Sequence, residues 1–203
     1  MTCTDSRSTD DLLAAWAQGQ ESALETLFAR HRAYLRQLVD VRLDPALRAR
    51  VDASDIVQET LLVASRRIQD FMDRRPTTFR LWLRRYAMER LVDARRRHLA
   101  HKRDARRDIS ITDASSMAIA EKLHVKEAGR KIVLQELATS IRETLGKLSE
   151  QDQEILLLRH AEGLTNAESA ELLGIDPGTS RKRHGRALQR LSKELRSLGI
   201  SSL

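Results

Sequence analysis

The stretch LTNAESAELLGIDPGTSRKRHGRALQRL, residues Leu164 to Leu191, predicts two helices separated by a tight turn. Thr165 and Glu168 match a capping box, in which a hydroxyl and an acid three residues later satisfy backbone groups at a helix start. Gly174 can end this short helix in a left-handed conformation, and Asp176–Pro177 can begin the next one. A further box, SEQD at residues 149–152, predicts an earlier helix. The order helix, short helix, turn, helix is the helix-turn-helix plan.

The last of these helices has two chemically different sides on a wheel of 100° per residue. The predicted packing side holds Ser180, His184, Ala187, Leu188, Leu191 and Leu195. The opposite side holds Gly178, Lys182, Gly185, Arg186 and Gln189, with Thr179, Arg181 and Arg183 at its flanks. Small residues permit close approach, and long cations and an amide suit base edges and phosphates in a major groove. The alternative interpretation is a solvated basic face on an ordinary helix hairpin. For His184, which falls on the packing side, we expect a packed histidine and not a ligand or a pH switch.

This C-terminal stretch, from LSEQDQEILLLRH onward, resembles the promoter-reading domain of bacterial RNA polymerase sigma factors of the compact extracytoplasmic-function (ECF) type. The Pro-Gly-Thr start of the last helix and its Arg183 and Arg186–Ala187 pattern carry most of the resemblance. Ser180 and His184 stand where the family usually has aliphatic residues. The resemblance implies recognition of the minus-thirty-five promoter element by Thr179, Arg181, Lys182, Arg183, Arg186 and Gln189.

The segment VDASDIVQETLLVASRRI, residues 51–68, predicts a helix capped by Asp52. Acids line one side of it, and Ile56, Leu62 and Val63 are expected to bury another. Three acids could indicate a metal-dependent nuclease, but no histidine or further carboxylate stands at ligand spacing, and acids stabilise a helix start in any case. The resemblance instead implies a surface that docks on core RNA polymerase. Its residues are Asp52, Asp55, Gln58 and Glu59.

The segment from Arg74 to Arg107 contains 13 bases and three acids, which gives it a net charge of +10. Phe79, Trp82 and Tyr86 recur on one helical face, which is typical of a core, although an aromatic beside a basic groove can also stack on an unpaired base. The resemblance implies that this helix and the preceding loop read and open the minus-ten element. Glu89 departs from the Asn that the family often has. The residues implied are Arg74, Arg75, Phe79, Arg80, Trp82, Arg85, Glu89, Arg90, Arg96 and Arg97.

Composition and periodicity bound the remaining possibilities. The 203 residues carry 36 bases and 29 acids, a net charge of +7 that favours polyanionic partners. Apolar residues recur at helical spacing in residues 10–98 and 131–198, and a polar, charged segment at 99–130 separates them. We therefore expect an all-α protein of two small helical domains joined by a linker that can hold a short helix, with the helix-turn-helix in the C-terminal domain.

Other functional classes are disfavoured by what the sequence lacks. No run of residues is long and apolar enough to span a membrane, the start is no signal peptide, and the single cysteine, Cys3, cannot form an internal disulfide. We expect a cytoplasmic sigma factor without metal, cofactor or catalytic residues. Its expected partners are core RNA polymerase, duplex and melted promoter DNA, and an anti-sigma factor. The alternative is a stand-alone helix-turn-helix regulator that binds duplex DNA. This alternative gives the acidic helix at residues 51–68 no function.

Overall fold

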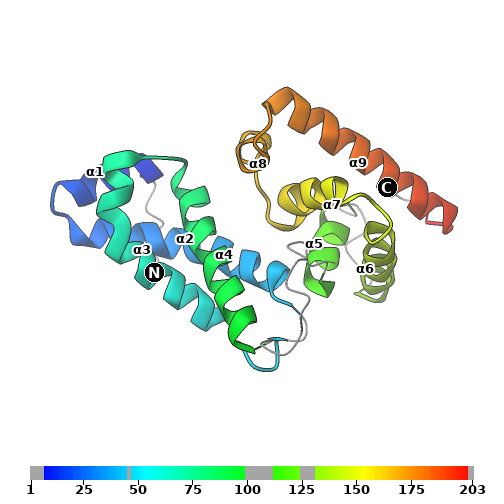
Figure 1. The fold of residues 1–203 in the computed structure, drawn as a ribbon, viewed down its shortest axis with the longest axis horizontal. Helices are drawn as coiled ribbons and strands as arrows, with labels where there is room; N and C mark the ends of the chain where they lie inside the picture. The colour runs from blue at the N-terminus through cyan, green and yellow to red at the C-terminus, as the bar shows by residue number, and fades with distance from the viewer. Residues whose placement is uncertain (1–6, 45–46, 99–111, 124–130, 201–203) are drawn as a thin grey trace. The chain divides into compact units, whose positions relative to one another are not determined.

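The computed structural model describes residues 7–44, 47–98, 112–123 and 131–200, and all regular structure in these ranges is helical. The helices form two compact units, residues 1–39 with 51–96, and residues 40–50 with 97–203. In Figure 1, α1–α4 gather in one body and α5–α9 in the other. None of the described helices is long and apolar enough to cross a membrane.

Unit 1 is built from α1 (Thr9–Ala17), most of α2 (Glu21–Arg42), α3 (Ala53–Arg74) and α4 (Phe79–His98). Its core combines leucines from α1 and α2 with an aromatic cluster at the α3–α4 end. The Trp82 ring lies 4.9 Å from that of Phe71, 5.5 Å from that of Phe79 and 5.1 Å from that of Tyr86, centroid to centroid. These edge-on and tilted contacts are the arrangements that aromatic pairs prefer, so the cluster stabilises the α3–α4 hairpin.

Unit 2 contains α5 (Asp113–Leu123), α6 (Lys131–Leu145), α7 (Glu150–Leu156), a π-helical turn η2 (Leu157–Ala161), α8 (Asn166–Leu173) and α9 (Pro177–Ser197). One apolar cluster joins these helices, with Ile119, Ile141, Ile155 and Leu191 fully buried in it. The last turn of α2 also belongs to this unit, because Val41 lies in the same cluster.

Helix α5 falls inside the segment predicted as the linker, residues 99–130. It is a structural part of unit 2, since Ile119 and Ala120 are completely buried there. Its start is fixed by hydrogen bonds between Thr112 and Ser115, and the Thr112 hydroxyl also donates to the Val41 carbonyl at 2.9 Å. The difference arises because α5 is short and rich in Ser and Ala, so its sequence lacks the density of large apolar residues that marked the other helices. The remaining residues of the predicted linker lie outside the described residues.

A buried ion-pair network in unit 2 joins the end of α2 to α7 and to Glu162, the residue that follows η2. The Arg42 guanidinium donates to Glu162 from Nε at 2.6 Å and to both carboxylate oxygens of Glu154 at 3.1 and 2.9 Å. The side chain of Arg42 is only 4% exposed, that of Glu162 0% and that of Glu154 20%. Burial alone would lower the pKa of Arg42, but the two carboxylates outweigh it and raise that pKa above its ordinary value.

Candidate nucleic-acid and protein interfaces

The helix-turn-helix of unit 2 is defined by the caps expected from the sequence. Thr165 and Glu168 form a complete capping box at the start of α8, and Gly174 ends α8 with a φ of 62°. The Asp176 carboxylate accepts from the Thr179 backbone N–H at 2.9 Å and begins α9. The Asn166 amide also donates to the Pro177 carbonyl at 2.8 Å, which ties the start of α8 to the start of α9 across the turn.

The orientation predicted for α9 is confirmed by burial. Ser180, Ala187, Leu191 and Leu195 are completely buried. Arg183 is partly exposed, and the other five residues expected to face DNA are exposed: Thr179, Arg181, Lys182, Arg186 and Gln189. The helix therefore presents cations, the Thr179 hydroxyl and the Gln189 amide to solvent, the chemistry that a major groove accepts.

Two polar side chains of α9, Ser180 and His184, lie on its predicted packing side. His184 is half-buried, and its Nε2 lies 2.9 Å from Nε2 of His160 on η2, so one ring donates and the other accepts. Burial is the main cause that lowers the pKa of His160 to about 4 and also lowers the pKa of His184, so both rings are neutral at pH 7. Ser180 is buried with no hydrogen-bond partner for its hydroxyl among the described residues. The π-helical turn thus contacts the exposed basic helix directly through a histidine pair.

The start of α3 forms an exposed acidic surface. The Asp52 carboxylate caps α3 by accepting from the Ser54 backbone N–H at 2.7 Å, and this hydrogen bond is the main cause that lowers the pKa of Asp52. Asp55, Gln58 and Glu59 are all exposed on the same part of the helix. The four residues predicted to dock on a partner therefore share one accessible surface.

The expectation that Leu62 is buried is wrong, because its side chain is 53% exposed. Residues 60, 61 and 64 form the buried stripe of α3, and Leu62 lies about 100° from Leu61 around the helix axis. Leu62 instead follows Gln58 and Glu59 by one helical turn, so a large apolar side chain adjoins the acidic surface. The helical spacing of apolar residues did not predict that Leu62 is exposed, because more than one choice of buried face fits the sequence of α3.

The aromatic side chains predicted to contact melted DNA are placed in the core. Phe79 and Trp82 are each 3% exposed and Tyr86 is 4% exposed, and all three pack in the α3–α4 aromatic cluster. Phe79 and Trp82 are therefore corrected to core residues in this structure, because a base cannot stack on a ring that already packs against other rings.

The predicted cations around α4 lie in four places. Arg74 and Arg75 are exposed at the end of α3, where Arg75 has a φ of 36° and pairs with Asp10 at 3.1 Å. Arg80 is partly buried, with its guanidinium 4.1 Å from the centre of the Tyr34 ring. Arg96 and Arg97 are exposed near the end of α4.

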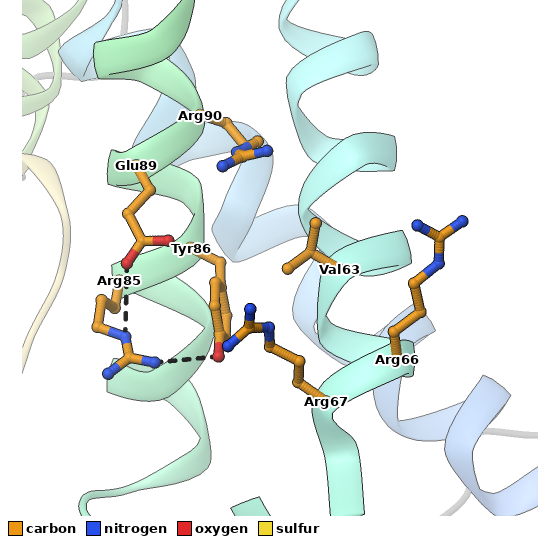
Figure 2. A pocket seen from close by; sticks show the side chains of 7 residues that line it. All are labelled: Val63, Arg66, Arg67, Arg85, Tyr86, Glu89 and Arg90. Carbon is orange, nitrogen blue, oxygen red and sulfur yellow. Dashed lines mark hydrogen bonds and ion pairs between the residues drawn. The ribbon is translucent and has the colours of Figure 1, made fainter. Parts of the chain in front are cut away.

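The fourth place is a pocket between α3 and α4 (Figure 2), which has a volume of about 330 Å³. Arg85, Glu89 and Arg90 line it from α4. Sequence reasoning missed the two arginines that α3 contributes to the same pocket, Arg66 and Arg67. Two neighbouring arginines in an arginine-rich chain do not by themselves predict that they line a pocket. They line this one because α3 packs against α4.

Comparison with known proteins agrees with these features. Residues 27–100 match the family described as "Sigma-70 region 2" and residues 138–191 the family described as "Sigma-70, region 4". The chain is 30% identical over 188 residues to the RNA polymerase sigma factor CnrH of Cupriavidus metallidurans, an alignment that covers 90% of this chain and 92% of CnrH. It is 27% identical over 190 residues to the ECF RNA polymerase sigma factor SigM of Mycobacterium tuberculosis, covering 93% and 85% of the two chains.

A solved structure, that of CnrH in complex with the cytosolic domain of CnrY, matches with a TM-score of 0.54 and 26% identity. The match covers 94% of this chain and 99% of that one. The two family regions contain the exposed acidic helix and the exposed basic helix respectively. The chain therefore belongs to the sigma-70 family of RNA polymerase sigma factors, of the extracytoplasmic-function type, and directs transcription initiation.

Proposed function

We propose that the chain performs initiation with three separate surfaces. The acidic surface of α3 binds core RNA polymerase, the cationic residues around α4 bind the minus-ten element, and α9 binds the minus-thirty-five element. The observation that carries this proposal is the exposure of these polar residues on helices whose other sides are buried in the core. The proposed domains are residues 10–98, which dock on core polymerase and recognise and melt the minus-ten element, and residues 131–198, which recognise the minus-thirty-five element.

The docking surface is proposed to consist of Asp52, Asp55, Gln58 and Glu59, with Leu62 as an apolar addition. Charged rims and a central apolar contact are common in protein interfaces. Because Asp55 and Glu59 are exposed and Asp52 performs the capping, replacing the first two leaves the helix start intact.

The minus-ten surface is proposed to use the exposed and partly exposed side chains alone, which are Arg74, Arg75, Arg80, Arg85, Glu89, Arg90, Arg96 and Arg97. Cations of this kind bind phosphates and hold an opened strand, because the DNA backbone dominates affinity. The minus-thirty-five surface is proposed to use Thr179, Arg181, Lys182, Arg183, Arg186 and Gln189.

Run-off transcription with core polymerase on a promoter library tests the proposal. The variant Asp55→Ala/Glu59→Ala should keep its stability within about 0.5 kcal/mol, as surface changes usually do, and should lose most core binding and promoter-dependent product. Glu25→Ala/Glu121→Ala, which removes two exposed acids elsewhere, should transcribe normally. Unchanged holoenzyme formation by the first variant would refute the docking surface.

A stand-alone helix-turn-helix regulator is the alternative, and it predicts duplex binding by α9 without any need for core polymerase. An anti-sigma factor is a further proposed partner, because the matching solved structure contains CnrH together with the cytosolic domain of CnrY. A protein that copurifies with the free chain and blocks its assembly with core polymerase would meet that description.

A further inference from the structure

The first half of α9, which carries most of the residues proposed to read DNA, offers little apolar surface to the core behind it. Residues 177–186 contain no Leu, Ile, Val, Met or aromatic side chain. The fully buried leucines of α9 begin only at Leu191. Apart from the cap and turn contacts described above, this half meets the rest of unit 2 through the small side chain of Ser180 and through the contact of His184 with His160. Its position therefore depends strongly on the histidine pair.

The two histidines meet nitrogen to nitrogen. Their Nε2 atoms are 2.9 Å apart and their ring centres 5.1 Å apart, so the rings point toward each other. Such a contact needs one proton between the two nitrogens, because one ring must donate an N–H and the other must accept with a lone pair. A metal ion would instead need both lone pairs to converge on a third point, and the described part of the chain offers no group of three metal ligands.

The sequence predicts His184 as a packed histidine, and only the tertiary structure brings His160 against it. His160 lies in the π-helical turn η2, and such turns are rare and frequently mark functional sites. The pair therefore joins an unusual turn to the half of α9 that carries the DNA-facing cations.

The charged groups that act on the pair are cations. Burial is the largest cause that lowers the pKa of both rings. For His160 the paired ring, Lys122 of α5 and Arg159 of η2 lower it further, and for His184 Arg159 does so. The acids of the neighbouring segments have other partners: Asp152 pairs with Arg190, Glu154 and Glu162 pair with Arg42, and Glu168 accepts from the Thr165 backbone N–H.

We propose that His160 and His184 are positioning residues for promoter recognition, and that they hold the first half of α9 in place only while the pair shares a single proton. A second proton sets one N–H against another and adds a positive charge beside Arg159 and Lys122. The pair then opens, both rings turn to water, and the DNA-facing side chains lose their fixed position. The proposal rests on the proposed reading of the minus-thirty-five element by α9, and it adds a dependence of that reading on pH.

The sign and the size of the effect follow from proton uptake. Below the ordinary histidine pKa of about 6.5, each separated ring binds a proton that the closed pair does not. The open form is therefore favoured by up to about tenfold per pH unit for each ring. Between about pH 7.5 and about pH 5.5, the two rings together favour the open form by up to roughly a hundredfold. Recognition is retained at the higher pH and lost at the lower one.

The experiment uses holoenzyme assembled from the full chain and core polymerase, at these two pH values and constant ionic strength. Its affinity is measured for a duplex promoter that the run-off experiment identifies, and for the same duplex with a scrambled minus-thirty-five element. The ratio of the two affinities separates upstream recognition from other effects of pH on the polymerase. The wild-type ratio should fall by about tenfold or more at the lower pH. His160→Gln/His184→Gln keeps an amide hydrogen bond without a titrating group, so its ratio should not change.

His31→Gln is the matched control. His31 is a half-buried histidine of unit 1, and burial, Arg80 and Arg30 lower its pKa to about 4 as well. Because His31 does not touch α9, this variant should keep the wild-type dependence on pH. Nuclear magnetic resonance of the ¹⁵N-histidine-labelled full chain provides a second measurement that needs no variant to fold. At the higher pH, one ring of the pair should carry its proton on Nε2 and the other on Nδ1.

The outcomes separate the proposal from the function on which it rests. If the wild type and His160→Gln/His184→Gln show equal ratios at both pH values, or if both rings carry their proton on Nε2, the positioning role is wrong and the reading by α9 stands. Loss of helical circular dichroism by the wild type at the lower pH would also overturn the positioning role, because the whole unit would then unfold. If Lys182→Ala/Arg186→Ala leaves the ratio unchanged at the higher pH, the proposed reading by α9 is itself wrong.

Discussion

Replacing Arg42 by Met should destabilise unit 2 strongly, although Met is apolar and of similar length. Arg42 is 4% exposed and neutralises Glu162, whose side chain is 0% exposed, and Glu154, whose side chain is 20% exposed. Removing one partner of a buried ion pair typically lowers the free energy of unfolding by about 3–5 kcal/mol, because the remaining charge is left buried without a partner or solvent. Small domains are stable by only about 5–15 kcal/mol, so the loss is a large fraction of the total.

The measurement is urea unfolding of the full chain followed by far-ultraviolet circular dichroism. Both tryptophans, Trp16 and Trp82, lie in unit 1, so their fluorescence reports unit 1 while circular dichroism reports both units. With an m-value of about 1–3 kcal/mol/M, a loss of about 3–5 kcal/mol should lower the unit 2 midpoint of Arg42→Met by roughly 1–5 M. The fluorescence transition should move less than the dichroism transition.

A matched substitution in the same unit is the control. Arg142 pairs with Asp113, and these side chains are 47% and 77% exposed, so Arg142→Met should cost at most about 1 kcal/mol. Adding Glu162→Leu to Arg42→Met should recover part of the loss, since it removes the stranded carboxylate. If Arg42→Met and Arg142→Met lowered stability equally, the account of the buried network would be refuted.

Three further predictions follow from unit 2. Arg186→Ala should reduce the preference for one base pair of the minus-thirty-five element by about 1–3 kcal/mol. Arg181→Ala should weaken binding to all DNA sequences alike and lower the salt dependence of binding by about 0.9. Duplex binding is measured at several salt concentrations, and a uniform loss for Arg186→Ala with altered base preference for Arg181→Ala would refute the two roles. Burial lowers the pKa of His160 from 6.5 to about 4, so this ring stays neutral in the folded chain while it takes up a proton in the unfolded chain. The free energy of unfolding should therefore fall as pH drops from about 6.5 to 4, by up to about 1.4 kcal/mol per pH unit. Urea denaturation of His160→Gln across this range should show a smaller fall in the free energy of unfolding, and an equal fall in the variant and the wild type would contradict the burial argument. Ile119→Ala should cost about 2–5 kcal/mol of unit 2 stability in the same assay, because it opens a cavity in the core, while a change below about 0.5 kcal/mol would return α5 to the linker.

The features that the sequence by itself determined are local ones. Ser149, Thr165 and Asp176 cap the helices that were predicted to begin after them, and Gly174 ends α8 in the left-handed region. Each depends on a hydrogen bond or a backbone angle within a few residues, so the chemistry is contained in the motif. The orientation of α9 was also predictable, because its apolar and charged residues divide into two opposite sides and only one of them can be buried.

Tertiary structure alone decided what lies opposite each side chain. Arg42 and Glu162 are 120 residues apart, and His160 and His184 are 24 residues apart, yet each pair is in hydrogen-bond contact. The rings of Phe79 and Trp82 could have served either the core or a base until the packing of α3 against α4 buried them. The same packing set Arg67 opposite Glu89 in one pocket and turned Leu62 outward. Periodicity defines which residues share a face of one helix, but a pocket or a buried pair needs two helices, and their relative rotation is set by how whole side chains fit together.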